Sequence, residues 1–328
     1  MSSATVSILK KIGIGFCSLI ALLVVFVITY YFIGEYYMFS QFKSKANTAQ
    51  AIPGLDEKYT PQGMWVDSEN EVYLYSGYMS DDTPSRIYVQ TEEETKYLLL
   101  KVDGKDFFGH VGGICSVNDY IYLASEKTVY TFLKNDALTL DNGNYISNIS
   151  YFIPNLNCSF IYEDGTYLYV GEFYKPKSYE TDPSHHIQTN DGTNKALVRS
   201  YTLNEDGSIG ELVNTYSIPD KIQGICITPS NKIVLSQSYG IANSHLIIYD
   251  LNKASIENGI TILDSRCFVD DVSCYPMSEA LDYDNGKVYI LFESAAKKYR
   301  LFNLFAQENV LTYDIQWYFY ITNLHRWG

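Results

Sequence analysis

Several catalytic signatures are missing from this chain of 328 residues. The chain has no Cys-x-x-Cys pair, no phosphate-binding glycine-rich loop, and no Ser-His-Asp arrangement with positional support. The first two absences argue against thioredoxin-type redox chemistry and nucleotide phosphate binding, and the third argues against a Ser-His-Asp hydrolase. No motif therefore names an enzyme class, and the fold has to be inferred from repeats and composition.

Basic residues are also scarce, with 24 Lys and Arg against 38 Asp and Glu. No acidic residue precedes Glu35, whereas Lys10 and Lys11 do, so the rest of the chain has 22 basic residues against 38 acidic ones. A surface with this balance repels nucleic acid and anionic lipid. We expect no nucleic-acid partner, and the acidic charge is explained by solubility.

Charge is absent from residues 12–34, which are rich in Ile, Val, Leu and Phe, with Tyr30 and Tyr31 near one end. This length predicts a membrane-spanning helix, and aromatic residues suit the interface. Lys10 and Lys11 place residues 1–11 in the cytoplasm by the positive-inside rule. A cleaved signal peptide is the alternative, but the run is longer than usual and no Ala-x-Ala site follows it. We expect a single-pass signal anchor in the cell membrane, a polar tether over residues 35–50, and an extracytoplasmic domain over residues 51–328.

A strand-turn-strand unit recurs along that domain, and residues 218–249 give its clearest copy, IPDKIQGICITPSNKIVLSQSYGIANSHLIIY. Inner strands are expected to begin near residues 62, 112, 158, 223 and 278. Their spacing is close to the 40 to 50 residues or so of a four-stranded blade. The sequence therefore predicts an all-β protein, a β-propeller with five blades, or six if the tail over 301–327 or the long third repeat hides another.

Ring closure is predicted from a short recurring pattern that contains Ile-Pro. Residues 51–54 resemble residues 152–155 and 217–220, and each of the later copies directly precedes an inner strand. The first copy has no preceding blade, so we expect it to supply the outer strand of the last blade. This pairing would remove two open sheet edges. Residues 312–322 are aromatic and predict a further strand.

The longer connections are expected on one face of the propeller, which should be the functional face. An insertion over residues 172–195 belongs to it, and the first residues of the inner strands ring the channel mouth there. The candidate ligand-binding residues on this face are Gln62, His110, Asn157, Glu172, Tyr174, Gln223, Tyr239, Glu279 and Glu293.

Oxygen-bearing side chains from several blades could hold calcium, and the candidate ligands are Glu279, Asn157 and Gln62. Alternatively, these polar groups satisfy backbone atoms and ordered water in the channel. Two carboxylates could also act as the acid and base of a glycosidase. His185 and His186 could bind a transition metal, although a solvated loop is the simpler interpretation.

The positions of the six cysteines favour structural roles over catalysis or metal binding. Cys115 and Cys226 occupy a repeat position that is apolar in other copies, which predicts burial. Cys267 and Cys274 bracket a short polar segment, and in an oxidising compartment they could form a disulfide.

The segments KIQGICIT, GHVGGICS and MSEALDYDNGKVYI resemble the propeller group that includes NHL repeats, strictosidine synthase and gluconolactonase-like proteins. The resemblance covers residues 61–292 through loose strand-turn-strand motifs. It implies a propeller fold, and in the gluconolactonase-like enzymes a Glu near the first inner strand helps to bind a catalytic calcium. Here the matching position is Gln62, and only the last repeat supplies an acid, Glu279. Those enzymes have six blades, whereas five repeats are counted here.

We expect a membrane-anchored propeller that binds a glycan, a peptide or a protein partner on its long-loop face, and not an enzyme. The alternative is a calcium-dependent hydrolase of the lactonase, esterase or glycosidase type at the channel mouth. A structural role within an envelope protein complex is a third interpretation.

Overall fold

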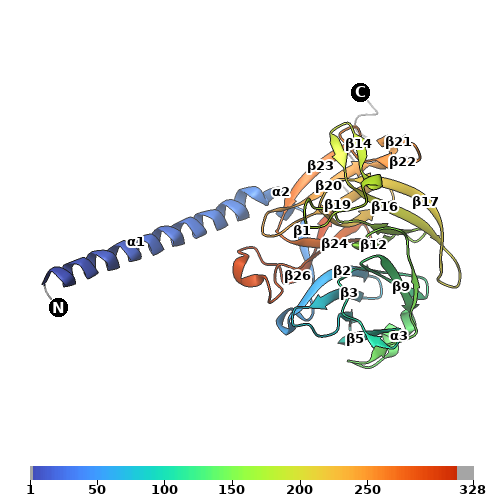
Figure 1. Ribbon diagram of the computed structural model, residues 1–328, viewed down its shortest axis with the longest axis horizontal. Coiled ribbons are helices and arrows are strands. Elements are labelled where there is room, and N and C mark those ends of the chain that lie inside the picture. Colours follow the sequence, from blue (N-terminus) through green and yellow to red (C-terminus); the bar gives the residue numbers. More distant parts are fainter. Residues whose placement is uncertain (1–2, 316–328) are drawn as a thin grey trace.

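The computed structural model describes residues 3–315, and a single long helix stands apart from a body of strands (Figure 1). Helix α1 (Ser3–Ile33) exposes most of its large apolar side chains from Ile12 to Ile33. Within the stretch Lys10–Met38, the most apolar 18-residue window has a mean hydropathy of 2.8, and no part of that window is buried. The helix is therefore long and apolar enough to cross a membrane.

Five inner strands form a closed ring, which confirms the five-bladed propeller. The ring order follows the sequence, and the last inner strand packs against the first. The inner strands are β2 (Tyr59–Asp67), β7 (Val111–Val117), β12 (Phe160–Glu163), β18 (Ile222–Ile227) and β24 (Ser278–Asp284).

Antiparallel strands extend each blade outward from its inner strand. Blade 1 adds β3 (Val72–Met79), β4 (Arg86–Gln90) and β5 (Thr95–Val102), and blade 2 adds β8 (Tyr120–Ser125), β9 (Thr128–Leu133) and β11 (Ser150–Phe152). Blade 3 adds β13 (Leu168–Gly171), β16 (Ala196–Leu203) and β17 (Ile209–Ile218), and blade 4 adds β19 (Lys232–Gln237), β20 (Ser244–Asp250) and β23 (Phe268–Cys274). Blade 5 adds β25 (Lys287–Phe292) and β26 (Asn309–Asp314).

Additional short strands extend the outer edges of blades 1 and 3, and a short helix and a hairpin lie in the connections between strands. Strand β10 (Tyr145–Ile146) runs parallel to β5, which also pairs with β6 (Lys105–Asp106), and a short helix, α3 (Lys134–Thr139), follows β9. Strands β22 (Ile260–Ile262) and β21 (Ser255–Glu257) extend blade 3 beyond β17. The hairpin β14 (Ile187–Thr189) and β15 (Gly192–Asn194) lies in the insertion after β13.

The predicted ring closure is present. Strand β1 (Ala46–Ala51) pairs antiparallel with β26, from Ala46 opposite Tyr313 to Ala51 opposite Asn309. The N-terminal segment therefore completes blade 5 and covers the edge that β26 would otherwise expose. The strand predicted over residues 312–322 begins earlier, within β26, and residues 316–322 lie outside the part of the chain that the structure describes.

The segment expected to be a tether, residues 35–50, is instead folded onto the propeller. It contains a π-helical turn (Gly34–Met38), helix α2 (Ser40–Lys43) and most of β1. Phe39 and Phe42 are fully buried, and the ring of Phe42 stacks on that of Tyr313 at 5.5 Å. The segment is not a tether because Phe39 and Phe42, spaced by three residues, anchor it to the propeller.

Glycine allows the inner strands to approach closely. A Cβ atom on Gly112 would lie 2.1 Å from the carbonyl oxygen of Ser159 on the next blade, and a Cβ on Gly224 would lie 2.9 Å from Ala280. Gly112 and Gly224 therefore allow neighbouring inner strands to pack at distances that a larger residue would prevent. Cys115 and Cys226 are buried as predicted, at 2% and 0% exposure.

The predicted disulfide between Cys267 and Cys274 is wrong, because both thiols are free. The two residues flank the length of β23, a strand of seven residues. An extended strand of this length separates its ends by roughly 20 Å, whereas a disulfide requires Cα atoms within about 7 Å. The Sγ of Cys267 instead contacts the carbonyl oxygen of Asp264 at 3.4 Å.

Candidate functional site at the channel mouth

A chain of hydrogen-bonded polar side chains crosses the channel mouth. The amide of Gln62 on β2 donates to the carboxylate of Glu293 at 2.9 Å, and its carbonyl oxygen contacts Nε2 of His110. The amide of Gln223 on β18 donates to Glu279 on β24 at 3.2 Å. Glu279 in turn hydrogen-bonds Glu293, just after β25. Blades 1, 4 and 5, with the segment before β7 of blade 2, thus contribute to one network.

A second layer of side chains adjoins this network. The ring of Tyr78, at the end of β3, stacks on that of His110 with centroids 4.6 Å apart. The Tyr78 hydroxyl accepts a hydrogen bond from Lys298 at 2.9 Å and lies 3.2 Å from the hydroxyl of Tyr299. Lys298 and Tyr299 come from the connection between β25 and β26, so this loop helps to form the mouth.

Burial controls the charge of the paired carboxyl groups. Loss of solvent raises the pKa of Glu279 well above its usual range, and the neighbouring Glu293 raises it further. Burial also raises the pKa of Glu293 to about 7, although Gln62, Lys298 and Glu279 oppose the shift. Two carboxyl groups in contact cannot both ionise easily, so the pair retains a proton at neutral pH.

The same environment keeps His110 neutral. Burial lowers the pKa of His110 to about 4, and the positive charge of Lys298 acts in the same direction. Burial and the nearby charge of Glu293 raise the pKa of Tyr299. The mouth therefore presents a neutral imidazole, the phenols of Tyr78 and Tyr299, two amides and a carboxyl pair, which together can donate and accept hydrogen bonds.

Glu172 and Asn157 belong to a different cluster, on blade 3. The carboxylate of Glu172 is 1% exposed, lies 3.0 Å from Nδ1 of His185, and accepts hydrogen bonds from the backbone N–H groups of Asn157 and Leu197. The side-chain amide of Asn157 donates to the carbonyl of Glu180. Glu172 thus holds both ends of the insertion over residues 172–195.

His185 does not lie in a solvated loop, because only 7% of it is exposed. His186 is also sheltered and contacts Thr181 at 3.2 Å. Within residues 3–315, no group of three or more His, Cys, Asp or Glu side chains is arranged to hold a metal ion. His185 and His186 thus contact different partners within the insertion.

The two tyrosines predicted on the long loops differ in exposure. Tyr174 is 3% exposed and packs against His186 and Lys195. Tyr239 is 44% exposed, with the ammonium of Lys175 lying 4.3 Å from its ring centroid. Only Tyr239 therefore presents its ring to an incoming molecule.

The structure adds Tyr78, Lys298 and Tyr299 to the mouth. The sequence marks Tyr78 only as an aromatic residue in the long connection after the second strand of blade 1. Lys298 and Tyr299 could have been expected at the mouth only from their position after Glu293, in a connection on the functional face. Nothing in the repeat pattern marked them, because the β25–β26 connection has no counterpart of similar composition in the other blades.

The opposite end of the channel carries a second acidic pair, in which Asp282 is buried and Glu163 is half-buried. Asp282 accepts a hydrogen bond from the backbone N–H of Val66 at 2.6 Å, and Glu163 accepts one from the indole of Trp65 at 3.1 Å. Burial and mutual repulsion raise the pKa of Asp282 well above its usual range. Because Trp65 and Glu163 belong to blades 1 and 3, their contact reaches past blade 2 and links non-adjacent blades.

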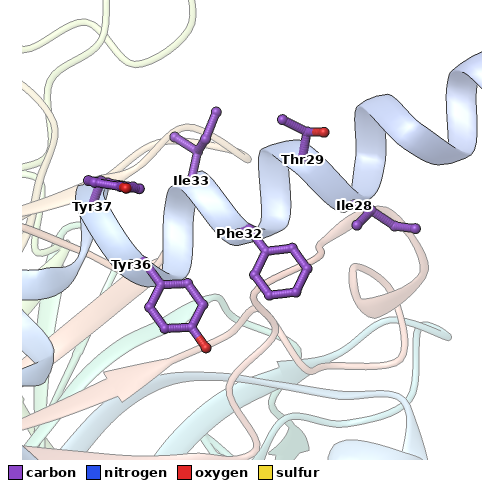
Figure 2. Close-up of a pocket in the computed structure, with 6 residues that line it drawn as sticks. All are labelled: Ile28, Thr29, Phe32, Ile33, Tyr36 and Tyr37. Carbon is purple, nitrogen blue, oxygen red and sulfur yellow. The ribbon is translucent and has the colours of Figure 1, made fainter.

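Two surface hollows lie away from this network. One, of 610 Å³, is lined only by side chains of α1 and the π-helical turn, as Figure 2 shows: Ile28, Thr29, Phe32, Ile33, Tyr36 and Tyr37. Its walls come from one helix, so it is a groove along an exposed apolar surface. The other, of 360 Å³, lies where residues 51–57 meet Ala295, Arg300 and residues 308–309 on blade 5.

Comparison with known proteins gives likeness in structure only. No protein-family model and no curated protein sequence matches the chain. Similar solved structures include the PQQ-bound aldose sugar dehydrogenase of Streptomyces coelicolor, with 12% identity, coverage of 82% of this chain and 97% of that one, and a TM-score of 0.46. A gluconolactonase of Xanthomonas campestris is 9% identical, with coverage of 81% and 94% and a TM-score of 0.34.

Proposed function

We propose that this chain is a membrane-anchored, extracytoplasmic propeller that binds a hydroxyl-rich ligand of the glycan type at its channel mouth. The observation that carries the proposal is the continuous network from Gln223 through Glu279, Glu293 and Gln62 to His110. Four blades contribute to it, although a stable ring could be built without buried carboxyl groups. Buried polar groups of this kind are costly, which favours a functional reason for them.

The chemistry of the mouth suits sugar hydroxyls. Amide and carboxyl groups donate and accept hydrogen bonds in pairs, and the phenols of Tyr78 and Tyr299 offer a flat apolar face with a polar tip. The neutral state of His110 leaves one ring nitrogen as a donor and the other as an acceptor. Peptides or protein partners are the alternative ligands, and they would bind the exposed rim of the propeller near Tyr239.

The anchoring part of the proposal is supported by α1, whose apolar surface is exposed and long enough to span a bilayer. Lys10 and Lys11 before the span, with Glu35 after it, support a cytoplasmic N-terminus. The acidic propeller would then face the outside of the cell.

A calcium-dependent hydrolase is the second candidate, because a carboxyl pair can bind a hard cation when the cation displaces its protons. Glu279 and Gln62 lie in this network, whereas Asn157 lies with Glu172 and would join as a calcium ligand only after leaving the Glu180 carbonyl. A glycosidase is less well supported, since its carboxyl groups stand about 5 to 9.5 Å apart, whereas Glu279 and Glu293 hydrogen-bond each other.

A glycan array probed with the full-length chain in detergent tests the first proposal. We expect binding to a subset of glycans, with a tenfold or greater loss (about 1.4 kcal/mol) in Gln62→Ala. Tyr239→Ala is the matched control for the rim. Loss in Tyr239→Ala but not in Gln62→Ala would move the site away from the mouth, and no binding to any glycan would refute the ligand class.

Calcium titration calorimetry on the same preparation separates the second candidate. Binding that disappears in Glu279→Gln and weakens below about pH 7 would support a calcium site, because protons compete for the pair. Absence of binding heat at millimolar calcium would refute the calcium site.

A further inference from the structure

We propose that the connection between β25 and β26, residues 293–308, inserts apolar side chains into the membrane interface beside α1. The occupant of this surface is the bilayer that α1 crosses, so the inference rests on the anchoring part of the proposed function. It adds a second point of attachment and fixes which part of the propeller lies against the lipid.

The first observation is a cluster of exposed apolar side chains at the tip of this loop. Leu301 is 85% exposed, Phe302 is 79% exposed and Leu304 is 47% exposed. The first two lie in a single 3-10 turn, Arg300–Phe302, so the backbone holds them outward together. Adjacent large apolar groups left exposed in this way mark an interaction surface, whereas single exposed apolar residues are ordinary.

The second observation is the position of this cluster next to the helix. Phe305 of the same loop stacks on Tyr31 with ring centroids 5.6 Å apart and an interplanar angle of 8°, and it lies 6.0 Å from the ring of Tyr30. A Cβ atom on Gly34 would fall 2.3 Å from the Phe305 ring, so the helix passes directly over it. Figure 1 shows this orange-red loop projecting from the body toward the end of α1 that meets the propeller.

The depth of the loop follows from these contacts. Tyr30, Tyr31 and Gly34 form the last turns of the apolar span, where aromatic residues lie at the membrane interface. Phe305 therefore sits at interface depth, and Leu301, Phe302 and Leu304 are within four residues of it. Apolar loop residues at this depth favour insertion among the upper parts of the lipid chains.

The charged residues of the loop are consistent with insertion into a bilayer of neutral lipid. Of the three basic residues before the tip, Arg300 pairs with Asp56 at 2.6 Å and Lys298 donates to Tyr78. Lys297 is exposed and is near enough to the interface to reach a headgroup. Since the propeller is acidic overall, apolar insertion rather than attraction to anionic lipid must supply the attachment.

The consequence concerns the channel mouth. The loop that carries Leu301 and Phe302 also carries Lys298 and Tyr299, which contact Tyr78 at the mouth. Insertion of the tip would therefore hold the mouth close to the membrane surface, and a ligand would reach it from the plane of the membrane.

The test uses an environment-sensitive fluorophore on a single introduced cysteine in the full-length chain. In a Cys17→Ser background, the other five cysteines are buried, so Phe302→Cys can be labelled selectively. Ile256→Cys is the matched control, because Ile256 is 71% exposed on β21, on the far side of the body from α1 (Figure 1). Both side chains are exposed, so neither variant disturbs the core. The proteins are reconstituted into phosphatidylcholine vesicles, with and without a nitroxide quencher near the lipid carbonyl groups.

We expect the probe at residue 302 to shift its emission to the blue and to be quenched several-fold more than the probe at residue 256. Equal, water-like emission at both sites in vesicles that float with the protein would overturn the loop insertion and leave the anchor intact. A blue-shifted probe that the lipid quencher does not reach would show that protein covers the loop, and would also overturn it. Failure of the protein to float with vesicles would refute the anchor, and the insertion with it.

Discussion

The carboxyl group of Glu279 hydrogen-bonds the carboxylate of Glu293, and this contact joins the inner strand of blade 5 to the loop that follows its second strand. Gln223 supports one member of the pair from blade 4 and Gln62 supports the other from blade 1. The pair is therefore one point at which side chains connect the first and last blades, and β1 and β26 close the ring through the backbone.

The first prediction concerns the pH dependence of stability. In the folded chain the pKa of Glu293 is raised from 4.5 to about 7, so the folded state holds a proton that the unfolded state has lost. The stabilisation is complete below about pH 4.5 and is lost as pH rises to about 7. A shift of this size corresponds to on the order of 3 kcal/mol. We expect Glu293→Gln to remove this pH-dependent loss of stability. The unfolding free energy of Glu293→Gln minus that of the unmodified protein should therefore increase as pH rises through this range.

Chemical denaturation in detergent at several pH values measures this difference, and His110→Asn serves as a control of opposite sign. Burial lowers the pKa of His110 from 6.5 to about 4, so His110 stabilises the protein increasingly as pH rises through that range. A difference between Glu293→Gln and the unmodified protein that stays constant with pH would show that Glu293 titrates normally.

The second prediction separates the hydrogen bond from the charge of Glu279. Glu279→Gln keeps a donor toward Glu293 and an acceptor for Gln223, so we expect a melting temperature close to that of the unmodified protein. Glu279→Ala leaves both partners buried without their bond, which should cost about 1 to 3 kcal/mol. Glu69→Ala, on the exposed turn after β2, should change stability by less than about 0.5 kcal/mol. Equal losses in Glu279→Gln and Glu279→Ala would show that the carboxyl group acts through charge alone.

The fold was predictable because blade repetition is a local property of sequence. Short apolar runs separated by turn residues recur with each blade, and the Ile-Pro pattern at residues 52–53 marked the closing strand. The sequence did not reveal the docking of Phe39 and Phe42, because their partners Tyr275 and Tyr313 are more than two hundred residues away. The outer strands β21 and β22 were missed for a similar reason, since they join blade 3 after the chain has already built part of blade 4.

The site was predictable in part. Gln62, His110, Asn157, Gln223 and Glu279 were expected at one mouth, with Glu172 and Glu293 nearby, because strand order fixes which ends meet there. The structure joins all of these except Asn157 and Glu172 into one network. Glu172 was placed with them although its carboxylate faces His185 inside the insertion, and only the folded insertion shows this. Sequence position gives the face of a propeller on which a residue lies, but not the side chain it contacts.

The third prediction concerns that insertion. His185→Ala removes a partner that lies 3.0 Å from the buried carboxylate of Glu172, so residues 172–195 should open more often. Limited proteolysis should show cleavage within this segment several-fold faster than in the unmodified protein. His245→Ala is the matched control, because His245 pairs with Asp271 at the surface, where such a pair contributes little. Unchanged cleavage in His185→Ala would show that the backbone donors of Asn157 and Leu197 hold Glu172 without help.

The last prediction tests whether the segment after the helix belongs to the folded propeller. Phe42 is fully buried between Tyr275 and Tyr313, so Phe42→Ala should destabilise the domain by about 3 to 5 kcal/mol. Tyr37→Ala removes a ring of similar size that is 77% exposed, and it should change stability by less than about 0.5 kcal/mol. Thermal unfolding of both variants in detergent measures the difference. Because β1 begins only three residues after α2, loss of the Phe42 contact should also loosen ring closure, which hydrogen exchange at β1 and β26 would detect as faster exchange at both strands. If the two variants unfolded alike, residues 35–45 would act as a flexible tether after all, and the propeller would close through the β1–β26 pairing alone.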